Sequence, residues 1–211
     1  MIAFELTEDI VALQNSVRAR MGEKRFRHSI GVAEYAYKIG VDLKMENPKS
    51  LYIAGILHDV AKEMPLEHQL QIMKLPSNIY RFREEDLKSP TLYHAFCAPY
   101  ILLRDYPEFA TEEILYAVCY HTVGRADMTL FEKVIFLADY IENTRTYPDC
   151  IEVRRMYEYG IKSGECAEKV LNLCMLKVLD NTLNFLENKD YFISHRTHET
   201  RSSIFATLSL E

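Results

Sequence analysis

The sequence predicts a single all-α domain. Only 7 of its 211 residues are glycine and 7 are proline, so few positions would interrupt a helix. The strict alternation of apolar and polar residues that marks a half-buried strand is almost absent, and apolar residues recur instead at spacings of three and four. A chain of this length can bury a full hydrophobic core. We therefore expect one helical domain over residues 1–211.

The first three helices follow from capping and proline signals. Thr7 and the two acidic residues after it favour a capped helix that runs from residue 8 to about residue 20. A long helix is expected from about residue 23 to 46, and it should stop before Pro48, because the residue before a proline avoids helical geometry. A third helix is expected over about residues 49–62.

The rest of the chain continues the same pattern with one interruption. Pro65 suits the first turn of a fourth helix. Residues 76–90 are charged and irregular, and are the best candidate for a mobile loop. Further helices are expected over about residues 91–105, 111–121, 130–142, 149–162, 165–187 and 198–208.

Composition excludes several classes of protein. The formal charge of −6 leaves no broad basic surface for a nucleic-acid backbone. No apolar run approaches the roughly 18 residues of a membrane span, and the N-terminus lacks a signal-peptide pattern. The five cysteines are odd in number and form no Cys-x-x-Cys pair, which argues against a disulfide framework or a zinc-thiolate site. We expect a cytoplasmic protein without nucleic-acid or membrane partners; a homodimer stays open.

Histidine and aspartate residues stand far apart in apolar, helix-patterned segments. Burying one unpaired polar group costs roughly 2–7 kcal/mol, and a lone charge costs far more. A divalent metal would satisfy four imidazoles and two carboxylates together. The candidate ligands are His28, His58, Asp59, His94, His121 and Asp139.

The position of each candidate on its helix decides how strongly the sequence supports it as a metal ligand. His28 begins an apolar stripe that continues to Leu43, so it faces the core side of its helix. Taken alone, a core histidine is more often structural than a metal ligand. His121 and Asp139 also continue apolar stripes, however, and three separate helices that each bury one titratable group favour a shared site. His94 equally suits a plain helix start.

The His58-Asp59 dipeptide closes an apolar run and can supply two ligands near a helix end. Adjacent helical residues point about 100° apart, but both could reach an ion placed beyond the last turn. An aspartate has two oxygens and can bridge two ions. Lys62 follows three residues later, either as a solvated helix-end lysine or as a phosphate contact.

Four further residues could bind the substrate or line its cleft. Gly124 permits an unusual turn just after His121, and the adjoining Arg125 could clamp a phosphate with two hydrogen bonds. Glu142 and Arg145 follow the aspartate at 139 by one and two turns. They could line the same cleft, or form an ordinary surface ion pair.

Five longer sequence segments resemble those of a known family. They are Arg27-His-Ser-Ile-Gly-Val-Ala-Glu, Ala54-Gly-Ile-Leu-His-Asp-Val-Ala-Lys-Glu, Tyr120-His-Thr-Val-Gly-Arg-Ala-Asp-Met, Leu130-Phe-Glu-Lys-Val-Ile-Phe-Leu-Ala-Asp-Tyr-Ile-Glu and Leu179-Asp-Asn-Thr. In these strings and their order the chain resembles the YqeK family, bacterial HD-domain hydrolases that cut diadenosine tetraphosphate symmetrically to two ADP. The resemblance runs from about residue 25 to 187.

The resemblance implies an all-α fold around a centre of two divalent metal ions. These are commonly iron, with manganese or cobalt as alternatives. By motif position the ligands are the six candidates above, with Asp59 as the bridge. Lys62 and Arg125 would act in catalysis by stabilising charge on the phosphate groups, and Gly124, Glu142 and Arg145 would help to bind the nucleotide.

Three other functions stay open at the sequence level. The same fold could act on a deoxynucleoside triphosphate, a nucleoside monophosphate or a guanosine alarmone. The same ligands could hold the iron of a di-iron oxygenase. A non-catalytic nucleotide sensor is a third class, but the intact ligand set argues against it.

Overall fold

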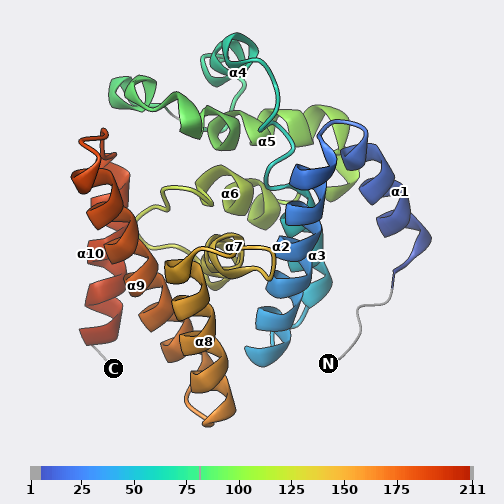
Figure 1. Cartoon of the computed structure of the whole chain (residues 1–211). Coiled ribbons are helices and arrows are strands. Elements are labelled where there is room, and N and C mark those ends of the chain that lie inside the picture. The colour runs from blue at the N-terminus through green and yellow to red at the C-terminus, as the bar shows by residue number, and fades with distance from the viewer. Residues whose placement is uncertain (1–5, 81, 210–211) are drawn as a thin grey trace.

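The apolar stripes of the sequence are the faces on which the helices pack. The computed structural model describes residues 6–80 and 82–209, and within this part of the chain the regular structure is helical, without strands (Figure 1). This confirms the all-α prediction. The α-helices are α1 (Glu8–Arg18), α2 (Glu23–Asp42), α3 (Pro48–Leu57), α4 (Leu66–Met73), α5 (Tyr93–Asp105), α6 (Glu112–Tyr120), α7 (Leu130–Ile141), α8 (Pro148–Lys162), α9 (Ala167–Asn188) and α10 (His195–Ser209). Short 3-10 helices are η1 (Glu84–Lys88), η2 (Pro90–Leu92) and η3 (Pro107–Phe109).

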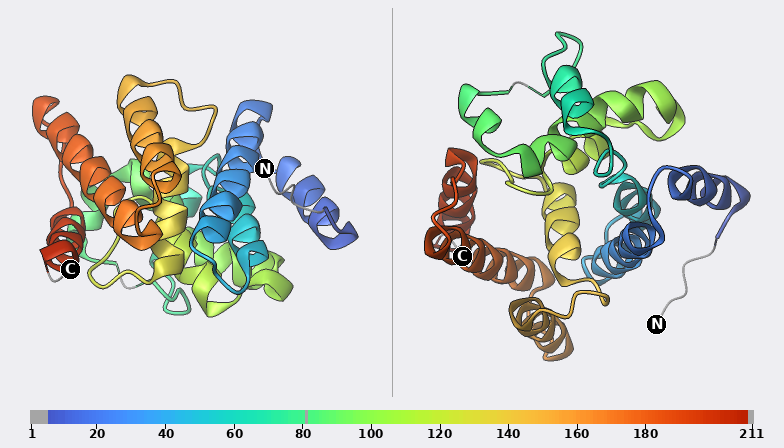
Figure 2. Two further views of the ribbon diagram at one scale, coloured as in Figure 1. Left: turned by 90° about the horizontal axis from the view of Figure 1, so that it is seen from below. Right: turned by 45° about the horizontal axis from the view of Figure 1, so that its top comes forward.

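Helix α7 lies at the centre of the arrangement (Figures 1 and 2). It packs against α2, α3, α6, α8 and α9, and most of its side chains are buried. Helix α2 also lies along α3, and α5 lies along α6. The elements that carry the candidate ligands are therefore neighbours in space.

Among the described residues, no helix is both long and apolar enough to cross a membrane. Residues 1–5, on which part of the signal-peptide prediction rests, lie outside the described residues.

One predicted helix end and one predicted side-chain cap are wrong, although α1 begins at Glu8 as predicted. Helix α2 stops at Asp42, earlier than the predicted residue 46, because Lys44 adopts a left-handed conformation with φ 56°. The chain then turns back, and the Met45 N–H donates to the Gly40 carbonyl at 2.9 Å. At the start of α1, Thr7 makes no side-chain cap; its hydroxyl instead accepts a hydrogen bond from Lys49 Nζ at 3.1 Å.

Helix α3 also ends earlier than predicted, and this matters for the site. It stops at Leu57, and residues 58–63 form consecutive turns rather than the expected helix to residue 62. The backbone hydrogen bonds in this segment join residues three apart; for example, the Lys62 N–H donates to the Asp59 carbonyl at 2.9 Å. This tighter winding places His58 and Asp59 just beyond the helix end.

Residues 76–80 and 82–90 are largely irregular, as predicted, but they are also tied to the core. Tyr80 is buried, stacks on Phe96, and donates from its hydroxyl to Asp86 at 2.7 Å. The segment includes η1, which the sequence did not indicate. Helix α10 begins at His195, slightly before the predicted residue 198.

Gly55 sets the spacing of α2 and α3 and gives a first test of the packing. A Cβ at this position would lie 2.5 Å from Ala33 Cα and 2.6 Å from Ala33 N, which is backbone that cannot move aside. We expect Gly55→Ala to lower the free energy of unfolding by about 1–3 kcal/mol, measured by urea unfolding of metal-stripped protein. Gly22→Ala is the control, because its Cβ would meet only Glu63 carboxylate oxygens at 3.6 Å or more. Equal stability of both variants would contradict the close approach.

Candidate metal centre

Two histidines are held so that Nε2 points toward a common centre. His58 and His121 each place Nδ1 2.7 Å from a carbonyl oxygen three residues earlier in the chain, that of Gly55 and that of Val118. A hydrogen bond from Nδ1 to a carbonyl fixes the tautomer and leaves Nε2 as the free lone-pair atom. Both rings are buried. The local structure thus prepares both imidazoles as ligands.

A carboxylate orients the ring of His28 in the same way. Its Nδ1 lies 3.0 Å from Glu142 Oε1, and Glu142 is fully buried at the end of α7. Glu142 in turn accepts hydrogen bonds from the backbone N–H and the hydroxyl of Thr144, at 2.6 and 2.5 Å. Burial raises the pKa of Glu142, but these hydrogen bonds outweigh it and lower the pKa overall. Glu142 therefore orients His28, and the alternative of a surface ion pair is wrong.

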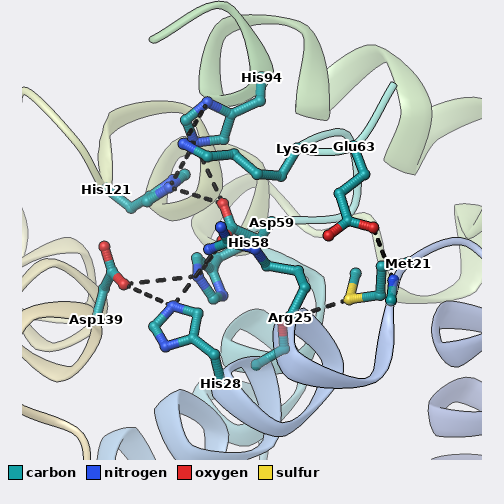
Figure 3. Close-up of polar contacts among 12 residues, drawn as sticks. Met21, Arg25, His28, His58, Asp59, Lys62, Glu63, His94, His121 and Asp139 are labelled. Carbon is teal, nitrogen blue, oxygen red and sulfur yellow. Dashed lines mark hydrogen bonds and ion pairs between the residues drawn. The ribbon is translucent and has the colours of Figure 1, made fainter. Parts of the chain in front are cut away.

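Asp59 lies between two pairs of histidines, and each of its oxygens faces one pair (Figure 3). Oδ2 is 3.4 Å from His58 Nε2 and 3.9 Å from His28 Nε2. Oδ1 is 3.2 Å from His94 Nε2 and 3.7 Å from His121 Nε2. This is the arrangement that a carboxylate needs in order to bridge two ions.

Asp139 completes the first of these two groups. Its Oδ1 lies 2.9 Å from His28 Nε2 and 3.8 Å from His58 Nε2. Arg145 holds the same carboxylate, with Nη2 2.7 Å from Oδ1 and Nε 3.0 Å from the Asp139 carbonyl. All six predicted ligands are therefore brought together by α2, α5, α6, α7 and the turn after α3.

The residues fit a divalent metal. Ligand atoms within 4.8 Å of one another form three overlapping groups: His28 with His58 and Asp59, His58 with His121 and Asp139, and Asp59 with His94 and His121. Within the described part of the chain, the buried His58 Nε2 has no hydrogen-bond partner. A buried nitrogen without a partner is costly, and a metal bond would relieve that cost. Imidazole and carboxylate donors suit iron, manganese and cobalt.

The electrostatics of the cluster keep the carboxylates charged. Burial raises the pKa of Asp59, but the facing histidines outweigh it and hold the pKa well below its usual range. The pKa of Asp139 is likewise low, since His28 and Arg145 outweigh burial. Burial lowers the pKa of His94 to about 4, so its ring is neutral near pH 7. Charged carboxylates and a neutral imidazole are the forms that bind metal.

Lys62 lies at the edge of the cluster. Its Nζ is 3.2 and 3.3 Å from the two ring nitrogens of His94 and 3.4 Å from the Thr91 carbonyl (Figure 3). Lys62 is half-buried and lies beyond the end of α3 at Leu57, so it is not a solvated lysine of the last helical turn. A role in contacting phosphate stays a prediction for Lys62.

Comparison with known proteins identifies the family of the segment that carries this cluster. The model of the HD domain matches residues 25–144, the segment that carries all six candidate ligands. The chain belongs to the HD domain family. The resemblance to HD-domain hydrolases in the sequence is thereby confirmed.

Named relatives of this HD-domain protein cover most of its length. Symmetrical bis(5'-nucleosyl)-tetraphosphatase of Bacillus subtilis is 35% identical over 82% of this chain and 86% of that protein. The protein of the same name from Staphylococcus aureus is 33% identical over 85% of this chain and 86% of its own. A crystal structure from Clostridium acetobutylicum, described as a predicted HD superfamily hydrolase involved in NAD metabolism, has a TM-score of 0.80 and 30% identity, and covers 97% of this chain and 100% of that one.

Arg125 is not directed at the metal ligands in this structure. Its guanidinium forms two hydrogen bonds with the buried Glu132, at 2.9 and 2.7 Å, and lies over the rings of Tyr116 and Tyr120. Gly124 has φ 69°, the left-handed region that favours glycine, as the sequence predicted for a turn. A role in binding phosphate stays a prediction for both residues, and for Arg125 it requires the pair with Glu132 to open.

A cavity of about 450 Å³ opens beside His28. Its walls come from the start of α2, the turns after α3 and the segment after α7. They are formed by Lys24, Arg25, His28, Glu63, Glu142, Thr144, Arg145, Thr146 and Tyr147.

Sequence reasoning missed Arg25 in this wall. Arg25 precedes His28 by three residues and so lies one turn earlier on the same side of α2. Its Nη1 is 2.7 Å from Asp59 Oδ2. The spacing to His28 was the signal that could have found it.

Proposed function

We propose that this HD-domain protein is a metal-dependent hydrolase that cleaves diadenosine tetraphosphate symmetrically into two ADP. The observation that carries the proposal is Asp59, whose two oxygens face two separate pairs of histidines. That geometry supports a centre of two ions rather than one. The substrate is supported by the names of the relatives from Bacillus subtilis and Staphylococcus aureus, at 35% and 33% identity.

The ligands divide into two groups around Asp59. His28, His58 and Asp139 would hold one ion together with Oδ2, while His94 and His121 would hold the other together with Oδ1. We propose iron as the native metal, with manganese or cobalt as working substitutes. The second group has fewer protein ligands, and therefore leaves more room for substrate.

The chemistry depends on the ions and on the residues around them. Bound divalent ions would polarise phosphate oxygens and activate a water molecule for attack on phosphorus. Asp59 and Asp139 stay charged, because their pKa values are held low. Lys62, beside His94, would stabilise negative charge that grows on the phosphate groups during the reaction. Arg145 would orient Asp139 and contact the polyphosphate from the cavity side.

We also propose that the protein works in the cytoplasm on a small nucleotide. Its five cysteines are free thiols, as is usual in a reducing compartment. The formal charge of −6 is unsuited to binding a nucleic-acid backbone.

Product analysis tests the proposed reaction. The purified protein, loaded with Fe²⁺, Mn²⁺, Co²⁺ or Mg²⁺ in turn, should convert diadenosine tetraphosphate to ADP alone. In ¹⁸O-water one label should appear in one of the two ADP products. Chromatography that finds AMP and ATP without ADP would contradict symmetric cleavage. Faster turnover of a deoxynucleoside triphosphate, or a requirement for O₂, would favour the other functions that the ligand set allows.

A further inference from the structure

The end of α7 carries three residues that shape one side of the metal centre. Asp139 is a candidate ligand, and Arg145 holds its carboxylate. Glu142 orients the ring of His28. These residues lie in the last turn of α7 or directly after it. The backbone of residues 139–145 therefore decides how His28 and Asp139 meet.

The end of α7 also leaves carbonyl groups without partners inside the helix. The last four C=O groups of an α-helix have no intrahelical donor. Glu142 has φ −57° and ψ 157°, which is outside helical geometry, so the helix does not continue and supply these donors. Donors from another segment are needed to hold this end of the helix in one geometry.

Arg154 of α8 supplies such donors. Its guanidinium donates from Nε to the Ile141 carbonyl at 2.5 Å, and from Nη2 to the carbonyls of Glu142 and Arg145 at 2.5 and 2.7 Å. A guanidinium is a planar fork of donors, and its positive charge is favourable at a helix C-terminus. We call these three hydrogen bonds the Arg154 clamp. They tie together the carbonyls of the turn that follows α7.

The packing of α8 holds Arg154 in place. Its neighbours Val153 and Tyr157 are fully buried, and the Tyr157 hydroxyl donates to Asp42 at the end of α2 at 3.0 Å. Helix α8 packs on α7 and α9 (Figure 1). The clamp reaches only backbone carbonyls, and Arg154 is not part of the cavity wall beside His28. Any effect of Arg154 on the metal centre must therefore pass through the backbone of the turn.

We propose that Arg154 is a positioning residue of the metal centre, which fixes the side formed by His28 and Asp139 through the backbone of residues 141–145. The inference rests on the proposed function only in taking the cluster of histidines and aspartates as a metal centre. Loss of Arg154 loosens the turn and, through it, His28 and Asp139. His121 is unaffected, because a carbonyl of α6 holds its ring.

Calorimetric titration of Mn²⁺ into metal-stripped protein measures the effect on metal binding. Arg154→Ala should weaken one of the two ions on the order of tenfold, the low end of the effect of removing a partner of a metal ligand. Arg154→Lys should weaken the same ion, because an ammonium keeps the charge but cannot span three carbonyls. Arg155→Ala is the matched control, as Arg155 is the next residue of α8 and is exposed. Wild-type affinity for both ions in either Arg154 variant would overturn the proposal.

Two double variants show which ion depends on Arg154. His121→Ala leaves the ion on the His28 side, and added Arg154→Ala should weaken that ion on the order of tenfold. His28→Ala leaves the ion on the His121 side, whose affinity the added substitution should not change. Equal weakening in both backgrounds would overturn the proposal, because the effect would then be general.

Val153→Ala separates positioning from a general loss of stability. Truncation of this fully buried side chain leaves a cavity under α8. It should lower the urea midpoint of metal-free protein and keep the wild-type affinity for both ions. Loss of the same ion as in Arg154→Ala would overturn the positioning role.

Rescue by free guanidinium is a second test of the hydrogen bonds themselves. Guanidinium chloride, added to Arg154→Ala well below its denaturing range, should restore part of the lost Mn²⁺ affinity. Sodium chloride at the same ionic strength should not. An equal effect of the two salts would overturn the clamp.

Hydrogen exchange of metal-free protein, measured by NMR, tests the clamp without a metal. The Arg145 N–H donates to the Glu142 carbonyl at 3.0 Å inside the turn. The Gly124 N–H donates to the Tyr120 carbonyl at 2.8 Å, after α6, and serves as the internal control. Arg154→Ala should speed exchange at Arg145, relative to Gly124, on the order of tenfold. Unchanged exchange at Arg145, or equal acceleration of both amides, would overturn the clamp.

The exchange measurement also separates this inference from the proposed function. If the wild type binds no Mn²⁺ but Arg154→Ala speeds exchange at Arg145 alone, the metal centre fails and the clamp of the turn stands. If the wild type binds two ions and Arg154→Ala changes neither binding nor exchange, the metal centre stands and the positioning role fails.

Discussion

Asp59→Ala should remove both metal ions from the protein. Asp59 is the one described residue whose oxygens face both pairs of histidines, with Oδ2 toward His58 and Oδ1 toward His94. Loss of a mere supporting partner of a ligand already costs on the order of 10–100-fold in affinity or activity. Loss of the bridge should therefore lower hydrolysis by more than about a hundredfold, to the background of the assay.

Elemental analysis of carefully loaded protein is the measurement. The wild type should carry close to two ions per chain, and Asp59→Ala close to none. His121→Ala should mainly weaken one ion, because His121 belongs to only one side of Asp59. Glu168→Ala, at an exposed carboxylate of α9, is the control for handling losses. A wild type that never exceeds one ion would rule out the centre of two ions.

The periodicity of apolar residues was enough to place some ligands but not others. The stripe that begins at His28 is buried along α2 as predicted, because a helical face is fixed by spacing alone. The end of α3 could not be read in this way. Apolar residues continue past Leu57 at Val60 and Ala61, yet the backbone changes to tighter turns there. The apolar pattern is the same on both sides of Leu57, so it does not reveal the change of winding that places His58 and Asp59 beyond the helix end.

Sequence spacing also could not decide which charged neighbours pair. Arg125 was predicted as a phosphate clamp because it adjoins Gly124 just after His121, and in the structure its Nε and Nη2 donate to Glu132 in the first turn of α7. Glu142 was predicted to line the cleft, and it does line the cavity beside His28, but its carboxylate is bound by His28 and Thr144. Each of these pairs joins two segments whose relative position is set by the packing of the core. A local sequence pattern carries no information on that packing.

Lys62→Ala should lower kcat by about a hundred- to a thousandfold while the metal content stays at the wild-type value. Loss of one donor aimed at developing charge in a dry site typically has this effect. Lys62 suits the role because Nζ lies beside His94, which faces Asp59 Oδ1. Burial lowers the pKa of Lys62, although Asp59 opposes this by raising it. The ammonium is thus partly desolvated, and its attraction for phosphate is less screened than at the surface.

Steady-state kinetics distinguish this role from simple binding. If Lys62 held only ground-state phosphate, KM would rise in Lys62→Ala while kcat stayed level. Lys62→Arg is the stricter variant, because a guanidinium is broader than an ammonium and should not fit a contact formed by a point charge. Arg125→Ala should also lower kcat if its pair with Glu132 opens when substrate binds. Wild-type kcat/KM in Lys62→Ala would show that its contact with His94 serves packing alone, and that the charge of the phosphates is met entirely by the metal ions and the arginines of the cavity wall.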